Sequence, residues 1–497
     1  MALDLVLIHP SSRRQVYQGL ADNLAAVEPP VWAGLLATYA RKKGFSVAIL
    51  DGDADELDAE AMAGRVRELD PRLVAIVVYG HQPSASTQSM PAASAACTAI
   101  RQLDPSRKIL LVGGHVAALP ERTLNEEAAD YVCSGEGPVT LVDLLKELSS
   151  SAPDLNKVRG LYWKERGLTR HSAAAPLVEN LDEEMPGVAW DLLPMHKYRA
   201  HNWHCFGDLP RQPYASIYTT LGCPYKCTFC CIQAPFKSGE EVAGRSATSN
   251  SYRRWSPQAV IAQIDTLVKD YGVRNLKVAD EMFVLHPKHV LGICDAIIER
   301  GYDLNIWAYA RVDTVRENMI DKLRQAGFRW LALGIEAADE RVRDEVQKGF
   351  DEAEIRRTIG ALRDAGIRVI GNFIFGLPED DAETMRKTLD LAFELECDFV
   401  NFYSTMAYPG SPLYKTALEH GWALPETWNG YSQHSIDTLP LPTKHLAASE
   451  VLRFRDQAFT RYFKSEKVLA FMEQRFGAAT ANHLREMSDK TLARRFV

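Results

Sequence analysis

At 497 residues the chain is too long for one ordinary hydrophobic core, so its length predicts two or three domains. Hydrophobic residues make up 46% and charged residues 25%, as in a soluble globular protein, and the net charge of −8 argues against a general nucleic-acid binder. No apolar run approaches the roughly 18 residues that cross a bilayer. The N-terminus lacks the basic segment of a signal peptide, so we expect a cytoplasmic protein with no membrane span.

The first part of the chain, residues 1–150, alternates short apolar runs with helical patterns. The runs predict strands at 3–8, 47–50, 73–78, 109–112 and 131–133. Between the first two strands, Pro29 and Pro30 precede apolar residues that recur at i, i+3, i+4 and i+7, which indicates a helix packed on the sheet. This alternation predicts an α/β domain with a doubly wound parallel sheet.

Polar residues and glycines stand at the predicted ends of these strands, where ligands bind in doubly wound sheets. They are Ser11, Tyr79, His81, Gly113, Gly114, His115, Gly135, Glu136 and Gly137. Glycine lets a backbone come close to a bulky ligand, but turns between strands and helices also use glycine, and a single pair does not separate these two interpretations. Three such strand ends in one domain favour a nucleotide-like ligand.

Residues 151–214 are rich in proline and predict a connector, after which a β run at 216–220 leads into Cys223, Cys227 and Cys230. Thiolates are the preferred ligands of iron–sulfur clusters, and three rather than four leave one iron open for a substrate. Zinc is the alternative, but a structural zinc site needs four ligands. Cys231 follows Cys230 directly and would point away, while the other five cysteines stand alone, as small buried hydrophobic residues do.

Residues 215–424 repeat a strand–helix pattern six times. Predicted strands lie at 216–220, 276–278, 304–307, 330–335, 369–375 and 399–404, with amphipathic helices near 256–270, 287–299, 316–325, 352–365 and 382–395. The tail, residues 425–497, predicts a loop followed by helices. In parallel barrels the functional residues lie where the strands end.

These features together resemble the cobalamin-dependent radical S-adenosylmethionine (SAM) enzymes, in particular the class B methyltransferases. The Cys-x3-Cys-x2-Cys spacing with Phe229 before the last cysteine is similar to the radical SAM signature, and the six units resemble that family's partial (β/α)6 barrel. Residues 1–150 resemble the cobalamin-binding domain that precedes many such barrels, although the Asp-x-His-x-x-Gly motif that supplies a cobalt ligand elsewhere is absent. The resemblance implies a [4Fe–4S] cluster, SAM, and a cobalamin without a protein histidine.

The resemblance also implies which residues contact each cofactor. Cys223, Cys227 and Cys230 would hold the cluster, and the nine strand-end residues of the first domain would surround cobalamin. SAM contacts would come from Phe229, Asp280, Glu281, Arg311, Glu336, Asn372 and Gly376. An acidic residue at a strand end also serves as a helix cap, which is the alternative for Asp280 and Glu281. No catalytic residue is assigned, and Tyr403 and His204 are the candidates on the substrate side.

The predicted function is methylation of an unactivated carbon of a small-molecule substrate through a 5′-deoxyadenosyl radical and methylcobalamin, with an electron donor such as flavodoxin or ferredoxin and no nucleic acid. Ring formation, ring contraction or oxidation without methyl transfer is the alternative. A tRNA methylthiotransferase would carry three further cysteines in its N-terminal domain, where this chain has only Cys97 and Cys133. A protein that only binds would not need three cysteines at the end of a barrel strand.

Overall fold

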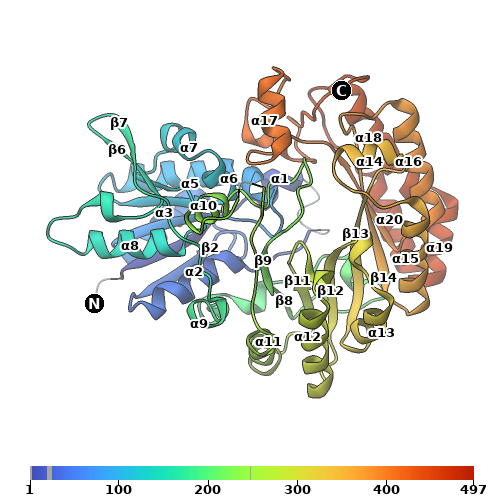
Figure 1. Cartoon of the computed structure of the whole chain (residues 1–497), viewed down its shortest axis with the longest axis horizontal. Coiled ribbons are helices and arrows are strands. Elements are labelled where there is room, and N and C mark those ends of the chain that lie inside the picture. The colour runs from blue at the N-terminus through green and yellow to red at the C-terminus, as the bar shows by residue number, and fades with distance from the viewer. Residues whose placement is uncertain (1–2, 19–24, 247) are drawn as a thin grey trace.

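The computed structural model describes residues 3–18, 25–246 and 248–497, and its two large sheets stand side by side (Figure 1). The first sheet has the order β2-β1-β3-β4-β5-β6-β7. Its parallel strands are β1 (Leu5–His9), β2 (Val47–Asp51), β3 (Leu73–Val78), β4 (Ile109–Gly113) and β5 (Tyr131–Cys133). The predicted doubly wound α/β sheet is confirmed. Part of the predicted connector extends it, because the hairpin of β6 (Leu161–Glu165) and β7 (Leu168–His171) pairs antiparallel with β5.

Helices cover both faces of the first sheet, because its buried strands alternate between two cores. Leu5 and Leu7 pack toward α2 (Val31–Lys42) and α8 (Pro138–Leu148). Val6 and Ile8 pack on the opposite face toward α3 (Ala59–Leu69) and α5 (Met90–Leu103). The shorter helices of this domain are α1 (Arg13–Tyr17), α4 (Ala85–Gln88), α6 (Gly114–Ala118) and α7 (Pro120–Glu126).

The second sheet is an open parallel barrel with the order β15-β14-β13-β12-β11-β8. Its strands are β8 (Tyr214–Ile217), β11 (Asn275–Val278), β12 (Asn305–Arg311), β13 (Phe328–Glu336), β14 (Arg368–Phe375) and β15 (Phe399–Ser404). The helices on its outer face are α11 (Pro257–Tyr271), α12 (Pro287–Arg300), α13 (Glu317–Gln325), α14 (Glu340–Glu345), α15 (Glu352–Asp364) and α16 (Ala382–Leu395). The predicted six-unit barrel is therefore present.

The bounds of one predicted strand differ in the structure. The run at 216–220 does not continue straight, because β8 ends at Ile217 and Thr219 is held by Asp280, whose carboxylate accepts a hydrogen bond of 2.6 Å from the Thr219 amide. The chain then turns into β9 (Thr220–Gly222), which pairs antiparallel with β10 (Tyr252–Arg254) outside the barrel. This small ribbon carries the cysteine loop. The short helix α10 (Lys237–Val242) follows that loop.

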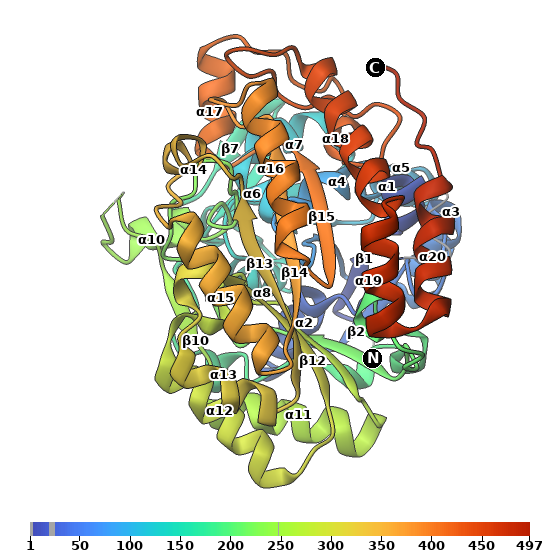
Figure 2. The ribbon, with the colours of Figure 1, turned by 90° about the vertical axis from the view of Figure 1, so that its right-hand side faces the viewer.

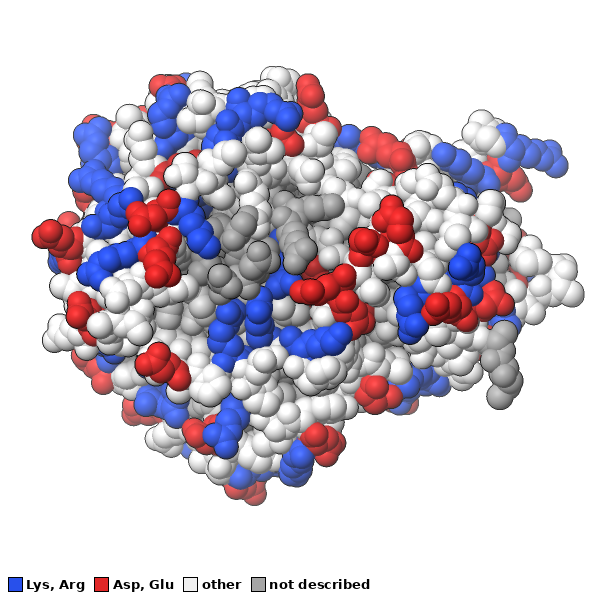
Figure 3. Space-filling view, turned by 180° about the vertical axis from the view of Figure 1, so that it is seen from behind, with Lys and Arg blue, Asp and Glu red and all other residues white. Residues whose placement is uncertain are grey.

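The tail adds the helices α18 (Ala448–Phe463), α19 (Glu466–Phe476) and α20 (Ala478–Asp489). Helix α18 packs against β15, and α20 lies on the far side of α19 in Figure 2. Helix α17 (Pro412–Glu419) comes before the tail. Within the described residues, no helix is both long and apolar enough to span a bilayer. On the face drawn in Figure 3, acidic and basic side chains are interspersed over most of the surface.

Candidate functional site

A cavity of about 710 Å³ lies between the two sheets, within the size range of small-molecule sites. The first domain contributes the loops that follow β1 and β3, including His9, Gly80 and His81. The barrel contributes the cysteine loop and the interior ends of its strands. Both domains therefore line the same cavity.

The cysteine loop forms one wall of the cavity. Cys223, Cys227 and Cys230 all line it, with Cys223 buried and the other two partly exposed. The loop starts at Gly222, which has a φ of +85° and where a Cβ atom would stand 2.3 Å from the Ser251 carbonyl oxygen, so this position requires glycine. The Cys223 amide donates a hydrogen bond of 3.1 Å to the buried Gln233 side chain, which anchors the loop.

The donor set of this loop, three thiolates, matches the ligands of an iron–sulfur cluster. Within a four-iron cluster each thiolate binds a different iron. Burial raises the pKa of Cys223 to about 12 and also raises that of Cys230. Binding to iron would therefore have to deprotonate these thiols.

Arg311 ends strand β12 within reach of the cysteine loop. Its side chain is buried, with two nitrogens donating to Asp313 at 2.9 and 2.8 Å, and its Nη1 lies 3.5 Å from the Cys227 sulfur. Its guanidinium also lies over the Tyr225 ring, 3.9 Å from the centroid. Burial opposes the charge, but Asp313 outweighs it and the pKa of Arg311 is raised. A fixed cation therefore stands beside the proposed cluster.

Glu336 ends strand β13 and forms a buried ion pair that sequence reasoning missed. The Lys348 ammonium lies 2.7 Å from the Glu336 carboxylate, and both line the cavity. Glu336 has a φ of +67° after a register shift in the strand, and a Cβ atom on Gly334 would stand 2.6 Å from its Oε1. Glycine at position 334, two residues before Glu336, thus leaves room for the Glu336–Lys348 ion pair. Lys348 stands in a polar stretch of the sequence, and no motif or spacing marks it as a site residue.

Asp280 and Glu281, which follow strand β11, have different environments. Glu281 lines the cavity, and burial raises its pKa to about 8. Asp280 is not among the described lining residues. It is buried against Thr219, whose amide and hydroxyl both donate to it, and burial raises its pKa to about 6. The Asp280 carboxylate is thus bonded to Thr219, a contact that neither interpretation made from the sequence had anticipated.

Of the other predicted site residues in the barrel, some line the cavity and others lie elsewhere. Phe229, Asn372 and Tyr403 line the cavity. Gly376 packs outward: it has a φ of +80°, and a Cβ atom there would meet Val451 of α18 at 2.3 Å. His204 lies at the opposite end of the barrel, where its Nε2 is 2.9 Å from the carbonyl of Asn305, the first residue of β12.

In the first domain, several predicted cobalamin contacts are used in packing. Glu136 forms a buried ion pair with Arg253 of β10, with distances of 2.8 and 3.1 Å. Tyr79 stacks on Trp32 with centroids 4.2 Å apart and donates to the Glu136 carbonyl. His115 is buried with its ring edge against Trp428. These three residues join elements of the protein to one another.

The remaining predicted residues of this domain also have neighbours from the protein. Ser11 donates a hydrogen bond to the Asp53 carboxylate. The group that an added Cβ atom would first meet is the Val78 carbonyl at Gly113, the Ser86 hydroxyl at Gly114, the Ser238 hydroxyl at Gly135 and the Val112 side chain at Gly137. Among the described residues that line the large cavity, His81 is the only one of the nine. Both of its ring nitrogens are occupied, at 2.7 Å from the Pro29 carbonyl and 3.1 Å from the Ser216 hydroxyl.

A second buried ion pair connects the two domains. Lys277, inside the barrel on β11, lies 3.0 Å from the Glu28 carboxylate of the first domain, which also accepts a hydrogen bond of 2.7 Å from Tyr214. Burial opposes ionisation of Glu28, but His81 and Lys277 outweigh it and hold the pKa of Glu28 well below its usual range. A lysine within a strand pattern gives no local sign that its partner lies 249 residues away.

Comparison with known proteins agrees with this arrangement. A model of the radical SAM superfamily matches residues 217–392, and a model of the B12 binding domain matches residues 17–145. The chain therefore belongs to the radical SAM enzymes that carry a B12-binding domain. These two domains imply a [4Fe–4S] cluster, SAM and cobalamin.

The relatives are similar over nearly the whole chain. An uncharacterized methyltransferase of Pyrococcus horikoshii is 28% identical over 442 residues, which is 89% of each chain. An anaerobic magnesium-protoporphyrin IX monomethyl ester cyclase of Cereibacter sphaeroides is 26% identical over 94% of this chain and 71% of its own. The radical SAM methyltransferase TsrM of Kitasatospora setae, solved with cobalamin and a [4Fe–4S] cluster, shares the fold with a TM-score of 0.67, at 16% identity over 98% of this chain and 100% of that one. The protein is thus a cobalamin-dependent radical SAM enzyme.

Proposed function

We propose that this enzyme methylates an unactivated carbon of a small-molecule substrate. The observation that carries the proposal is the shared cavity, which is lined by the three cysteines of the barrel and by the loops at the end of the first sheet. A substrate carbon in this space would be within reach of both domains. The relatives named as methyltransferases support the same outcome.

When bound, the cluster with SAM supplies a 5′-deoxyadenosyl radical, and cobalamin supplies the methyl group. Cys223, Cys227 and Cys230 would hold the cluster and leave one iron without a protein ligand. Arg311 and the Lys348–Glu336 pair would hold the charged groups of SAM, because fixed cations and carboxylates match its carboxylate and ammonium. An electron donor such as flavodoxin or ferredoxin would reduce the cluster.

The inner part of the cavity would hold the substrate. Trp203, Trp307 and Phe399 line its floor, and Tyr403 lines the wall beside them. An apolar enclosure excludes water from the reacting groups and prevents side reactions of a radical. Tyr403 is the candidate for contact with the substrate, whereas His204 would support the barrel floor.

For cobalamin, His81 and His115 are poor candidates for a cobalt ligand. The two ring nitrogens of His81 already contact Pro29 and Ser216, and His115 is buried beside Thr87 at 3.1 Å. These contacts support a cobalamin without a histidine ligand from either position.

Ring formation without methyl transfer is the second candidate, because the magnesium-protoporphyrin ester cyclase is similar to 94% of this chain. Anaerobic turnover with methyl-deuterated SAM and candidate substrates separates the two functions. A product that carries the deuteromethyl group, detected by mass spectrometry, supports methylation. A modified product without the label, formed while SAM is cleaved, would contradict methylation and favour cyclisation or oxidation.

A further inference from the structure

Helix α18 and the C-terminal segment form a wall of the cavity beside strand β15. Arg455, Asp456, Phe459 and Thr460 of α18 line the cavity, as do residues 487–492. This wall stands at the β15 edge of the sheet, whereas Arg311 and Glu336 end β12 and β13. It is therefore a part of the cavity that the cluster and SAM residues do not supply.

Arg455 is the buried cation of this wall. It is 5% exposed, its Nε donates a hydrogen bond of 2.8 Å to the Phe402 carbonyl, and its Nη1 donates one of 2.9 Å to Asp456. These two contacts fix the guanidinium against the end of β15. Its Nη2 has no hydrogen-bond partner among the described residues.

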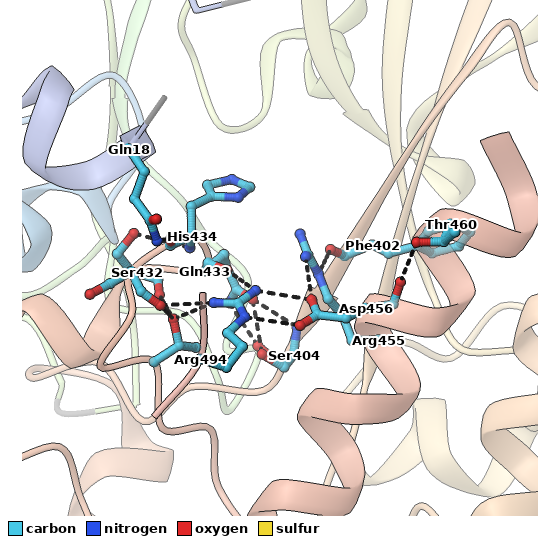
Figure 4. A network of polar contacts seen from close by, with 12 residues as sticks. Gln18, Phe402, Ser404, Ser432, Gln433, His434, Arg455, Asp456, Thr460 and Arg494 are labelled. Carbon is cyan, nitrogen blue, oxygen red and sulfur yellow. Dashed lines mark hydrogen bonds and ion pairs between the residues drawn. The ribbon is translucent and has the colours of Figure 1, made fainter. Parts of the chain in front are cut away.

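The carboxylate of Asp456 does not neutralise Arg455 alone. Arg494 lies at the centre of the network in Figure 4 and donates to both oxygens of Asp456 at 2.9 Å. Its other contacts are to the Gln433 and Ser435 carbonyls and the Thr438 hydroxyl, all neutral. Two buried arginines thus share one carboxylate, which leaves one positive charge in excess at the cavity wall.

The neighbouring titratable groups do not supply the missing negative charge. Burial lowers the pKa of His434 to about 3, so its ring is neutral at pH 7. Asp489, the other acid of this wall, pairs with Lys464 at 2.7 Å. A buried charge without a counterion is costly, and a guanidinium with free donors matches a carboxylate or phosphate.

We propose that Arg455 binds a carboxylate or phosphate of the substrate, which makes the substrate an anionic small molecule. This inference rests on the proposed function, because it takes the cavity as the substrate site. The anion would contact Arg455 at the β15 edge. The apolar part would extend along Phe459 toward the aromatic floor of Trp307 and Phe399.

The test uses three naphthalene probes that share a ring and differ in charge: 1-naphthaleneacetate, its neutral amide, and 1-naphthyl phosphate. Binding to the full chain, loaded with cluster and cobalamin, is measured anaerobically by calorimetry. We expect at least one anion to bind about tenfold more tightly than the amide, as one charge-assisted hydrogen bond provides. The better of the two anions identifies carboxylate or phosphate. Equal binding of all three probes overturns the proposal without any substitution.

Variants of α18 then locate the anion. Arg455→Gln should bind the anion and the neutral amide about equally, and Arg455→Lys should retain part of the preference for the anion. Arg461→Gln is the matched control, because Arg461 is exposed on the same helix. Thermal unfolding checks that each variant is folded. If folded Arg455→Gln still prefers the anion, Arg455 is not the anion site. If the substitution weakens the binding of SAM or cobalamin and leaves the preference for the anion unchanged, Arg455 contacts a cofactor and not the substrate.

Cofactor retention separates this inference from the proposed function. Cobalamin content after gel filtration and SAM cleavage are measured on the same protein without a probe. If both are intact and the amide binds as well as the anions, only the anion site is wrong. If cobalamin is not retained, the proposed methylation fails as well.

Discussion

The two sheets end on opposite sides of one cavity, yet their end residues serve different purposes. In the barrel, Glu281, Arg311 and Glu336 face the cavity. In the first sheet, Glu136 is paired with Arg253, and Tyr79 is stacked on Trp32. Polar residues at equivalent places of parallel sheets therefore face a cavity in one case and pack against other parts of the protein in the other.

The difference teaches that a strand end is only a potential site. At the first sheet, the small β9–β10 ribbon and the segment near Val178 approach the strand ends and bring Arg253 with them. A buried carboxylate with such a partner is already satisfied. At the barrel, Arg311 and Glu336 are paired locally or across one loop, and their pairs remain open to the cavity.

The largest expected effect is loss of the cluster. Cys223→Ala, Cys227→Ala or Cys230→Ala should each abolish the cluster and SAM cleavage, because each removes one of three thiolate ligands. The unmodified protein should bind about four irons after anaerobic reconstitution. Cys231→Ala is the control and should keep both iron and activity. An essential Cys231 with a dispensable Cys230 would show that the ligand assignment is wrong.

The next effect tests the structural role of Glu136. Glu136→Gln leaves Arg253 buried without its counterion, which should lower the free energy of unfolding by about 3–5 kcal/mol in urea titrations. The exposed Glu121→Gln should change it by less than about 0.5 kcal/mol. The folded Glu136→Gln protein should still retain cobalamin. Normal stability with lost cobalamin would reverse the comparison and make Glu136 a cofactor contact.

A smaller effect concerns SAM. Arg311→Ala or Glu336→Ala should weaken SAM binding by about 1.5–3 kcal/mol, the value of a charge-assisted hydrogen bond, while the absorption spectrum of the cluster stays the same. Arg316→Ala, in an exposed position after β12, is the control. Equilibrium binding of SAM to each reconstituted variant is the measurement. Unchanged affinity in both variants would mean that these strand ends do not hold SAM.

The smallest expected effect is at the cobalt. Residues 1–150 should supply no axial histidine. We expect electron paramagnetic resonance of the cob(II)alamin form to lack nitrogen superhyperfine splitting, whether from a protein histidine or from the cofactor's own base. His81→Ala and His115→Ala should leave the spectrum unchanged, because both side chains are occupied by the protein. Splitting that disappears in one of these variants would identify that residue as a ligand.

The sequence by itself determined the two parallel sheets, the order of their elements and the cysteine loop. These features depend on local patterns: apolar periodicity specifies strands and helices, and a cluster motif places its three thiolates within eight residues of one loop. Even so, the strand predicted at 216–220 bends, because Asp280 binds Thr219 from 61 residues away.

Tertiary structure alone decided which strand-end groups remain available to ligands. Glu136 meets Arg253 across 117 residues, Glu28 meets Lys277 across 249, and Arg494 joins Asp456 across 38. Each pairing satisfies a buried charge that would otherwise be costly, and no local spacing announces it. Packing also decided which charges face the cavity, some paired, as Glu28 is with Lys277, and others only partly paired, as Arg455 is, and a linear pattern does not encode this difference.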